Sequence, residues 1–251
     1  MKTIKTHTGK IYVDAERKLE FLTVGDYGKE NNIKADFLGL HKEINGVKNT
    51  EVDLRDKWVA TISTQKGCPM RCKFCDVPKY GFYGNASIDD LKYQIETIIK
   101  NEKVDYTERF NVHFARMGEP TWNNNVLDFS YMLKPLVGRL GLVAHTVHPV
   151  VSTMLPAGNK NLVKFLDEWC YIKNHVYKGE AGLQFSINST DEAQRDELFA
   201  HKSLSLAAIK KIADMLPMPV GRKYTLNFPV TAQTILDAKV LSRMFDKEKF
   251  I

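Results

Sequence analysis

The most informative segment of the sequence is Cys68-Pro-Met-Arg-Cys72-Lys-Phe-Cys75. Three of the four cysteines of the chain lie within these eight residues, with the spacing C-x3-C-x2-C. Thiolates are soft ligands that suit iron–sulfur clusters, Zn²⁺ or Cu(I). A [4Fe–4S] cluster needs four ligands, so three neighbouring thiolates leave one iron without a protein donor. An open iron can bind a substrate or cofactor directly, which favours a catalytic cluster over one that only stores electrons.

A structural zinc site is the alternative, with the three cysteines joined by a distant His or by Cys170. Zinc sites usually bring their ligands in C-x2–4-C pairs, and no second pair follows in this sequence. Chance grouping of core cysteines is disfavoured, because Arg71 and Lys73 interrupt the stretch and Gly67 and Pro69 make it a loop. The pattern therefore favours the iron–sulfur cluster and leaves zinc open.

The composition is that of a soluble globular protein. The 251 residues are 43% hydrophobic and 26% charged, which fits one large domain, alone or with a small extension. No apolar run approaches the ~20 residues that span a bilayer, and the first residues lack the apolar core of a signal peptide. Free cysteines in a ligand cluster need a reducing compartment. We expect a cytoplasmic protein without a membrane anchor.

The net charge is +6 and the isoelectric point is near 9.0. A basic balance favours a polyanionic partner such as RNA, because Lys and Arg neutralise phosphates.

Residues 1–57 differ from the rest of the chain. Short apolar runs at 19–24 and 33–38 flank the turn-rich stretch 25–32, which predicts a β-hairpin or small antiparallel sheet. We expect residues 1–57 to form an N-terminal β appendage and residues 58–251 to form the core.

From Trp58 onward, predicted strands and helices alternate. Ser87 followed by Asp90 is a capping box that predicts a helix start. Repeated strand–helix units favour an α/β fold with a parallel sheet or barrel. Lys249-Phe250-Ile251 reads as the opening of a sixth strand, so we expect the core to be incomplete at its C-terminus. The predicted strands are 58–63, 110–115, 145–153, 183–187 and 224–230; the predicted helices after the first are 126–136, 161–169, 191–199, 204–216 and 234–245.

Polar residues follow the successive strands. In parallel α/β folds, ligands gather at the carboxyl ends of the strands. Gly118 permits close approach of a ligand to the backbone, and the Glu119 carboxylate can accept from an ammonium group. Ser152, Ser186 and Asn188 offer neutral hydrogen bonds to a carboxylate or a ribose. Each residue alone could be a strand-ending turn or a helix cap, but their recurrence in one chain with the cysteine loop favours a shared site.

The cysteine spacing, with Phe74 just before the last cysteine, resembles that of the radical S-adenosylmethionine (SAM) superfamily. In that superfamily the open iron binds the amino and carboxylate groups of SAM, and reductive cleavage gives a 5′-deoxyadenosyl radical. The resemblance implies a partial (β/α)6-type parallel barrel.

Further motifs resemble those of the radical SAM RNA methyltransferases that methylate C2 or C8 of adenosine. They are spread over residues 51–245 and comprise Gln65-Lys-Gly67-Cys68, Tyr80-Gly-Phe82, Asn85, Met117-Gly118-Glu119-Pro120, Val151-Ser152-Thr153, Phe185-Ser186-Ile187-Asn188 and the stretch 193–198.

This resemblance implies a role for each matching residue. Cys68, Cys72 and Cys75 would ligate a [4Fe–4S] cluster. Gly118 and Glu119 would bind the amino group of SAM, and Ser152, Ser186 and Asn188 would line the rest of the SAM site. The implied partners are an RNA substrate, either rRNA or tRNA, and a flavodoxin- or ferredoxin-type reductant. No residue is assigned as a catalytic acid or base.

The sequence also departs from that family. Thr61 stands where the family has a cysteine that helps release the enzyme–RNA adduct, and Asn188 stands where His is common. The methyl-carrying cysteine of the family belongs to a C-terminal region that this sequence does not reach. Cys170, near the end of a predicted helix, is interpreted as a core cysteine. We expect only the short β appendage in place of the larger N-terminal RNA-binding domain of the family.

These departures leave the acceptor open. One alternative is a radical SAM enzyme that modifies a peptide or small molecule by hydrogen abstraction. An alternative of another class is a non-catalytic, metal-stapled RNA-binding protein.

Three aromatic residues near the cysteine loop have two interpretations. Tyr80, Phe82 and Tyr83 could stack a base or shield the cluster from water, and we favour shielding.

Overall fold

The computed structural model describes residues 1–6, 9–25, 42–44, 47–49 and 54–251. An eight-stranded sheet runs through the molecule in the order β1-β2-β3-β6-β9-β10-β11-β12. Two ribbons, β4–β5 and β7–β8, stand apart from it. The strands are β1 (Lys2–Lys5), β2 (Gly9–Asp14), β3 (Leu19–Gly25), β4 (Lys42–Ile44), β5 (Val47–Asn49), β6 (Trp58–Ile62), β7 (Gln65–Gly67), β8 (Phe82–Asn85), β9 (Tyr106–Phe114), β10 (Val143–Thr153), β11 (Gly182–Ser186) and β12 (Thr225–Asn227).

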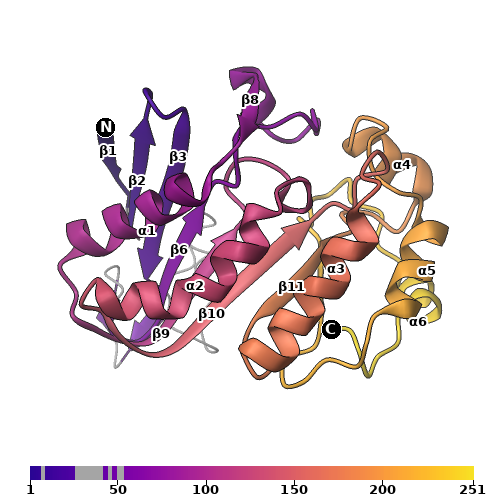
Figure 1. The fold of residues 1–251 in the computed structure, drawn as a ribbon. Coiled ribbons are helices and arrows are strands. Elements are labelled where there is room, and N and C mark those ends of the chain that lie inside the picture. Colours follow the sequence, from indigo (N-terminus) through magenta and orange to yellow (C-terminus); the bar gives the residue numbers. More distant parts are fainter. Residues whose placement is uncertain (7–8, 26–41, 45–46, 50–53) are drawn as a thin grey trace.

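Strands β6, β9, β10, β11 and β12 are parallel and follow chain order across the sheet. Helices α1, α2 and α3 lie along one face of these strands (Figure 1). The α/β prediction with a parallel sheet, ordered as in a partial barrel, is confirmed. The helices are α1 (Ile88–Glu102), α2 (Asn125–Arg139), α3 (Leu162–Tyr171), α4 (Glu192–Leu198), α5 (Leu206–Met215) and α6 (Ala238–Met244), with short helical turns η2 (Val77–Tyr80), η3 (Pro120–Trp122) and η4 (Ile172–Val176).

The hydrophobic core lies between the sheet and these helices. On β6, Trp58, Ala60 and Ile62 alternate with side chains of the opposite face, and all three are fully buried. Leu91 and Ile95 present the matching apolar stripe of α1. The period of two in the strands and of 3.6 in the helices therefore orients both layers toward one core.

The other face of the parallel strands is polar. Ser152 on β10 is the register partner of Gln184 on β11, and Ser186 is the partner of Asn227 on β12. Since hydrophobic residues occupy the alternate positions, these side chains point away from the helices. A row of hydrogen-bonding groups is thus available beside the carboxyl ends of the strands.

The first helix begins as predicted. Ser87 Oγ accepts a hydrogen bond from the Asp90 backbone N–H at 3.0 Å, and the Asp90 carboxylate accepts from the Ser87 N–H at 3.0 Å. This reciprocal pair satisfies two donors that the first helical turn leaves without partners.

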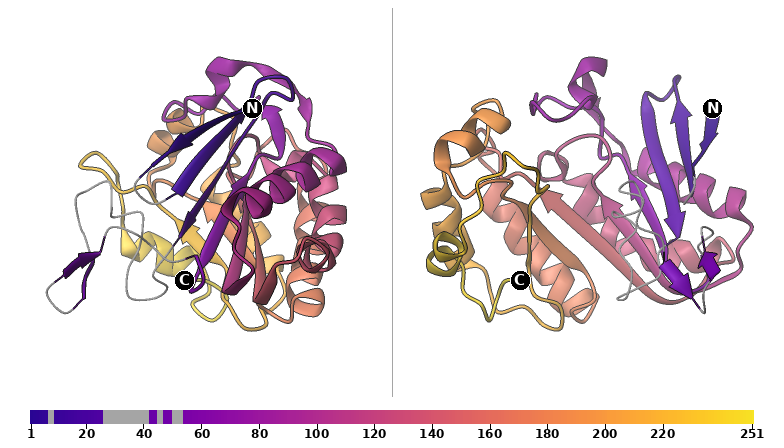
Figure 2. Two further views of the ribbon diagram at one scale, coloured as in Figure 1. Left: turned by 90° about the vertical axis from the view of Figure 1, so that its left-hand side faces the viewer. Right: turned by 180° about the vertical axis from the view of Figure 1, so that it is seen from behind.

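The N-terminal strands extend the main sheet. Strand β3 pairs antiparallel with β2 on one side and with β6 on the other, so β1–β3 and the parallel strands form one twisted sheet (Figure 2). The predicted strand at 19–24 is confirmed, whereas the predicted strand at 33–38 lies outside the described residues. The division of the chain after residue 57 stays a prediction.

The C-terminal part differs from the prediction in the lengths of its elements. Strand β12 covers only Thr225–Asn227, and α6 begins at Ala238 rather than at residue 234. Pro229 has no N–H for a sheet ladder, and Asp237 caps α6 by accepting from the Lys239 N–H at 2.7 Å. As expected for a sixth strand, Phe250 forms a parallel bridge with Tyr224.

Among the described residues, no helix combines the length and the apolar composition that crossing a membrane requires.

Candidate cofactor site at the carboxyl ends of the strands

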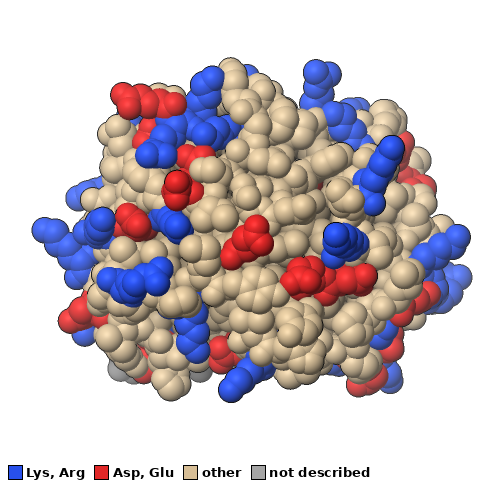
Figure 3. Space-filling model, in the orientation of Figure 1, with Lys and Arg blue, Asp and Glu red and all other residues tan. Residues whose placement is uncertain are grey.

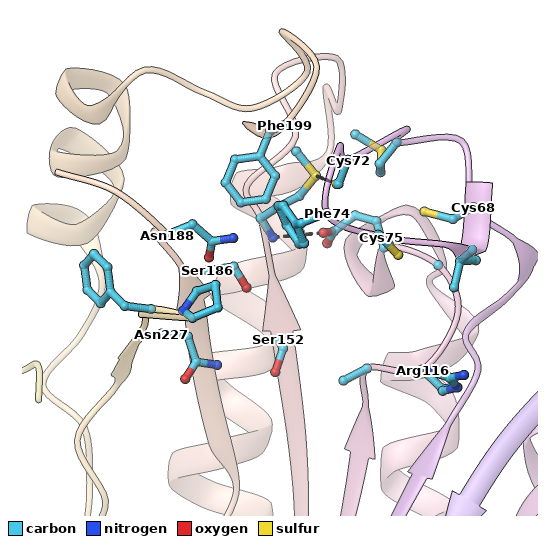
Figure 4. A pocket seen from close by; sticks show the side chains of 18 of the residues that line it. Cys68, Cys72, Phe74, Cys75, Arg116, Ser152, Ser186, Asn188, Phe199 and Asn227 are labelled. Atoms are coloured by element: carbon cyan, nitrogen blue, oxygen red, sulfur yellow. Dashed lines mark hydrogen bonds between the residues drawn. The ribbon is translucent and has the colours of Figure 1, made fainter. Parts of the chain in front are cut away.

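A cavity of about 840 Å³ opens at the carboxyl ends of the parallel strands. In Figure 4 the cysteine loop lies on one side of it, and Ser152, Ser186, Asn188 and Asn227 lie on the other. The cavity therefore separates a set of soft thiol ligands from a set of neutral hydrogen-bonding groups.

The cysteine loop connects β7 to η2 and is closed at its base by backbone contacts. Cys68 N–H donates to Gly81 O at 3.2 Å. Gly67 has a φ of +81°, and a Cβ at this position would lie 1.9 Å from Gly81 O, so only glycine fits. At the tip, Cys75 N–H donates to Cys72 O at 3.1 Å. All three cysteines of the loop line the cavity.

The thiols of this loop are free and partly buried. Burial raises the pKa of Cys68, and burial together with the neighbouring thiols raises the pKa of Cys72 to about 12. Within the described part of the chain, no three Cys, His, Asp or Glu side chains stand arranged as metal ligands. The soft donor set on a short loop fits an iron–sulfur cluster, and binding requires the thiol side chains to turn toward a common centre.

Gly118 brings the end of β9 against the start of β7. Its φ is +97°, and a Cβ there would lie 2.5 Å from Gln65 Cβ. Gln65 Oε1 accepts a hydrogen bond from the Glu119 N–H at 3.0 Å, and Gln65 Nε2 donates to Asn85 Oδ1 at 2.8 Å. Gln65 therefore links the backbone that carries Glu119 to the hairpin of β7 and β8, from which the cysteine loop projects.

The Glu119 carboxylate is buried at the floor of the cavity, with 4% of the residue exposed. Oε1 accepts from the Thr121 N–H at 3.2 Å and from Thr121 Oγ1 at 2.8 Å, and Oε2 accepts from the Met154 N–H at 3.0 Å. Burial raises the pKa of Glu119 despite these hydrogen bonds. No Lys or Arg of the described residues forms an ion pair with it, so a cationic ligand would supply the missing charge.

Three side chains form a hydrogen-bonded row across β10, β11 and β12. Gln184 Oε1 accepts from Ser152 Oγ at 2.7 Å and from Asn227 Nδ2 at 2.9 Å. This leaves the lone pairs of Ser152 Oγ and the carbonyl of the Asn227 side chain available toward the cavity. The row presents neutral donors and acceptors of the kind that bind a carboxylate or a ribose.

Asn188 and Arg195 fix the end of β11. Asn188 adopts a left-handed backbone conformation, with φ of 64°, that asparagine tolerates better than most residues. The Arg195 side chain is fully buried; its Nη2 donates to Met154 O at 3.0 Å and to Ser186 O at 3.4 Å. One guanidinium thus ties the carboxyl ends of β10 and β11 together beside the cavity.

The cavity contains all eight residues that the sequence predicted for the site: Cys68, Cys72, Cys75, Gly118, Glu119, Ser152, Ser186 and Asn188. Cys170 lies elsewhere. It is 1% exposed on α3, and Tyr224 Oη donates to its Sγ at 3.3 Å, which agrees with a core cysteine. Thr61 lies within β6, opposite Leu22 and His113 in the register, and is absent from the cavity lining.

The sequence did not indicate Asn227, which lines the cavity, or Gln184, which holds Ser152 and Asn227 by hydrogen bonds from behind the lining. Strand alternation could have indicated Gln184, because it lies two residues before Ser186 and therefore shares its face. No local pattern indicated Asn227, which joins the row through the pairing of β11 with β12.

No protein-family model matches the chain. Curated relatives include the dual-specificity RNA methyltransferase RlmN of Campylobacter hominis, 27% identical over 203 residues that cover 79% of this chain and 53% of the relative. The enzyme of the same name from Campylobacter concisus is 30% identical over 218 residues, covering 84% of this chain and 53% of the relative. The chain thus spans about half the length of the curated relatives it matches.

Among solved structures, the chain is similar to a radical SAM methyltransferase from Sphaerobacter thermophilus. The TM-score is 0.62 at 15% sequence identity, over 100% of this chain and 64% of that one. This likeness shows the fold. Together with the relatives in sequence, it confirms the predicted resemblance to radical SAM RNA methyltransferases.

Proposed function

We propose that this chain, similar to radical SAM RNA methyltransferases, holds a [4Fe–4S] cluster on Cys68, Cys72 and Cys75 and cleaves SAM reductively beside it. The observation that carries the proposal is that one cavity sets these thiols opposite a buried carboxylate and a row of neutral hydrogen-bonding groups. A structural zinc site would leave that arrangement without a purpose.

The bound and reduced cluster would supply the electron that breaks a carbon–sulfur bond of SAM. The residues of the chain would bind and orient the molecule. Glu119 would accept from the ammonium group of SAM, which provides the cation that this carboxylate lacks. Ser152, Ser186 and Asn188 would hold the carboxylate and ribose. Phe199 and Phe74 line the same cavity and pack edge-on, with ring centroids 5.6 Å apart.

The proposed acceptor is RNA, because the curated relatives are named RNA methyltransferases. The motif resemblance implies an adenosine of rRNA or tRNA. The net charge of +6 is compatible with a polyanionic substrate. The reductant would be a flavodoxin- or ferredoxin-type protein, and the compartment would be the reducing cytoplasm.

A second candidate is a radical SAM enzyme that abstracts hydrogen from a different acceptor. Thr61 favours it, because this position carries no thiol to resolve an RNA adduct. Cys170 cannot take over a role in the cavity, since it is buried on α3 against Tyr224. Both candidates share the SAM chemistry and differ only in the acceptor.

The test is to reconstitute the protein anaerobically with iron and sulfide, reduce it, add SAM and measure 5′-deoxyadenosine. We expect product from the parent and none from Cys72→Ala. A Cys170→Ala variant is the matched control, because it removes a thiol that lies outside the cavity.

A second measurement separates binding from cleavage. Glu119→Gln keeps the shape of the side chain and removes its charge, so we expect weaker SAM binding with the cluster still present in the absorption spectrum. Zinc in the purified protein, with no 5′-deoxyadenosine from the reconstituted parent, would overturn the proposal.

A further inference from the structure

The β7–β8 hairpin carries three exposed aromatic side chains, Tyr80, Phe82 and Tyr83, and is here called the aromatic hairpin. Their exposed fractions are 65%, 46% and 56%. A side chain that shielded the cluster from water would be largely covered by the cavity wall, and none of the three lines the cavity. The interpretation as a water shield is therefore not supported. Figure 1 shows this hairpin projecting beyond the carboxyl ends of the parallel strands.

Exposed aromatic side chains concentrate at this end of the molecule. Seven aromatic side chains are well exposed among the described residues, and five of them lie at or beside the cysteine loop: Phe74, Tyr80, Phe82, Tyr83 and Trp122. The other two, Tyr131 and Tyr171, lie on α2 and α3. Trp122 joins the hairpin through its carbonyl, which accepts from Asn85 Nδ2 at 2.9 Å. Most well-exposed aliphatic and Met side chains lie elsewhere, at the N-terminus, along β10, α3 and η4, and from Met215 onward; of these, Val230 lines the cavity. A protein-docking surface would mix aliphatic groups with rings, so this composition points to stacking instead.

A small cavity of about 270 Å³ lies between the aromatic hairpin and the β2–β3 turn. Tyr80 and Tyr83 line it, and Lys18 Nζ lies 3.4 Å from the centroid of the Tyr83 ring. This volume falls below the roughly 300–1,000 Å³ of pockets that enclose drug-sized ligands. It suits a single flat ring placed beside a tyrosine and a lysine.

The surroundings of the aromatic hairpin carry charges of both signs. Asp14 and Glu20 line the small cavity together with Lys18; Asp14 accepts from Tyr93 Oη at 2.6 Å, and Glu20 pairs with Arg116. Asp76 pairs with Lys79 at 2.6 Å. By contrast, no described carboxylate forms an ion pair with Lys18 or with Arg71 at the tip of the cysteine loop. These two cations remain available to a polyanion.

Figure 3 shows how the charged side chains are distributed over the face formed by the helices. Over the face formed by α1–α3, Lys and Arg alternate with Asp and Glu, so this face has no single basic patch. The net charge alone therefore does not select a binding surface on this side. The binding surface is instead indicated by the exposed rings of the aromatic hairpin and by Lys18 and Arg71.

We propose that Tyr80 and Tyr83, with Lys18, form a stacking site for an unpaired base of the RNA substrate, next to the nucleotide that enters the SAM cavity. The inference rests on the proposed function and adds the surface that would hold the RNA. Unstacked bases bind aromatic side chains through their π faces, and a neighbouring Lys neutralises the phosphate of the same nucleotide.

The test measures binding of a fluorescently labelled single-stranded RNA dodecamer to the reconstituted chain by anisotropy. We expect Tyr83→Ala and Tyr80→Ala each to raise Kd about tenfold, whereas Tyr83→Phe, which keeps the ring, leaves it unchanged. Lys18→Ala is expected to reduce the slope of log Kd against log salt concentration by about 1, the value for the loss of one phosphate contact. Tyr131→Ala is the matched control, since Tyr131 is an exposed ring on α2.

Formation of 5′-deoxyadenosine without RNA is measured on the same variants. Weakened RNA binding with unchanged 5′-deoxyadenosine supports the stacking site. RNA binding by Tyr83→Ala equal to that of Tyr131→Ala overturns the site and leaves the proposed SAM chemistry intact. A parent that forms 5′-deoxyadenosine but binds no RNA overturns both the stacking site and the RNA acceptor, and would leave the aromatic hairpin to a protein or small-molecule partner.

Discussion

Gly118 shows how one residue can set the geometry of the cavity. Its position has a φ of +97° and no room for a Cβ beside Gln65. An added methyl group would push Gln65 away from the Glu119 N–H, which it holds at 3.0 Å. The buried carboxylate then loses the backbone support that orients it.

We therefore expect Gly118→Ala to lower the free energy of unfolding by about 1–3 kcal/mol, as for strain at a special backbone conformation, and to abolish SAM binding. Gly138→Ala on α2 is the control, because open space surrounds its added Cβ. Alanine there should stabilise the helix by about 0.5–1 kcal/mol. Urea unfolding and calorimetry with SAM measure both effects. Equal stabilities of the two variants would contradict the close approach at Gly118.

His148 couples stability to pH. It is buried within β10, with Nδ1 2.8 Å from Glu180 O and Nε2 2.8 Å from Thr146 Oγ1. Burial, reinforced by Arg109, lowers the pKa of His148 from 6.5 to about 4. The unfolded chain therefore takes up a proton at a higher pH than the folded chain does. The contribution to stability is complete above pH 6.5 and is lost as the pH falls toward 4.

We expect the free energy of unfolding to fall between pH 7 and pH 5 by up to about 2 kcal/mol more in the parent than in His148→Gln, which cannot titrate. Urea titrations of both proteins at the two pH values measure the difference. The same loss in both proteins would assign the pH dependence to other groups.

At the scale of elements, the start of α1 is stabilised by a short motif. The Ser87 and Asp90 side chains each satisfy a backbone donor of the other residue. Lys66 Nζ also lies 2.9 Å from the Asp90 carboxylate. Because Lys66 belongs to β7, the cap joins α1 to the strand that leads into the cysteine loop.

Ser87→Ala should lower the free energy of unfolding by about 1 kcal/mol, the usual cost of losing an N-cap. Ser242→Ala, on the exposed side of α6, is the comparison and should change it by less than about 0.5 kcal/mol. Thermal or urea unfolding distinguishes the two variants. If Ser87→Ala were as stable as Ser242→Ala, water would be satisfying the same donors.

At the scale of the whole molecule, the end of the described chain closes part of the core. Phe250 is 5% exposed and packs against Phe245, Tyr224 and Phe185, with ring centroids 5.0, 5.4 and 5.8 Å away. Its neighbour Ile251 is 77% exposed, and the Ile251 N–H donates to Tyr224 O at 2.9 Å. These last residues therefore bury a ring and continue the parallel sheet.

Phe250→Ala is expected to lower the free energy of unfolding by about 3–5 kcal/mol, because it removes a large ring from a packed cluster. Ile251→Ala keeps the same backbone hydrogen bond and should change it by less than about 0.5 kcal/mol. Chemical denaturation of both variants provides the comparison. A small loss for Phe250→Ala would mean that the ring cluster does not support the sheet.

The amino-acid sequence was sufficient to predict the α/β alternation, the start of α1 and the three cysteines of the loop. These features depend on neighbours within a few residues: apolar periodicity, a capping pair and the C-x3-C-x2-C spacing. The polar residues at strand ends could be grouped as well, because parallel strands deliver their carboxyl ends to the same edge of a sheet.

The distant side chains that complete and support the cavity are brought together by strand pairing and packing in the folded molecule. Gln184 and Asn227 join Ser152 through strand pairing, and Gln65 supports Glu119 across 54 residues of sequence. The exposure of Tyr80 and Tyr83 and the approach of Lys18 from the β2–β3 turn also depend on packing between separate elements. Such contacts arise when strands far apart in sequence come within hydrogen-bonding distance, and no local pattern of residues encodes that distance.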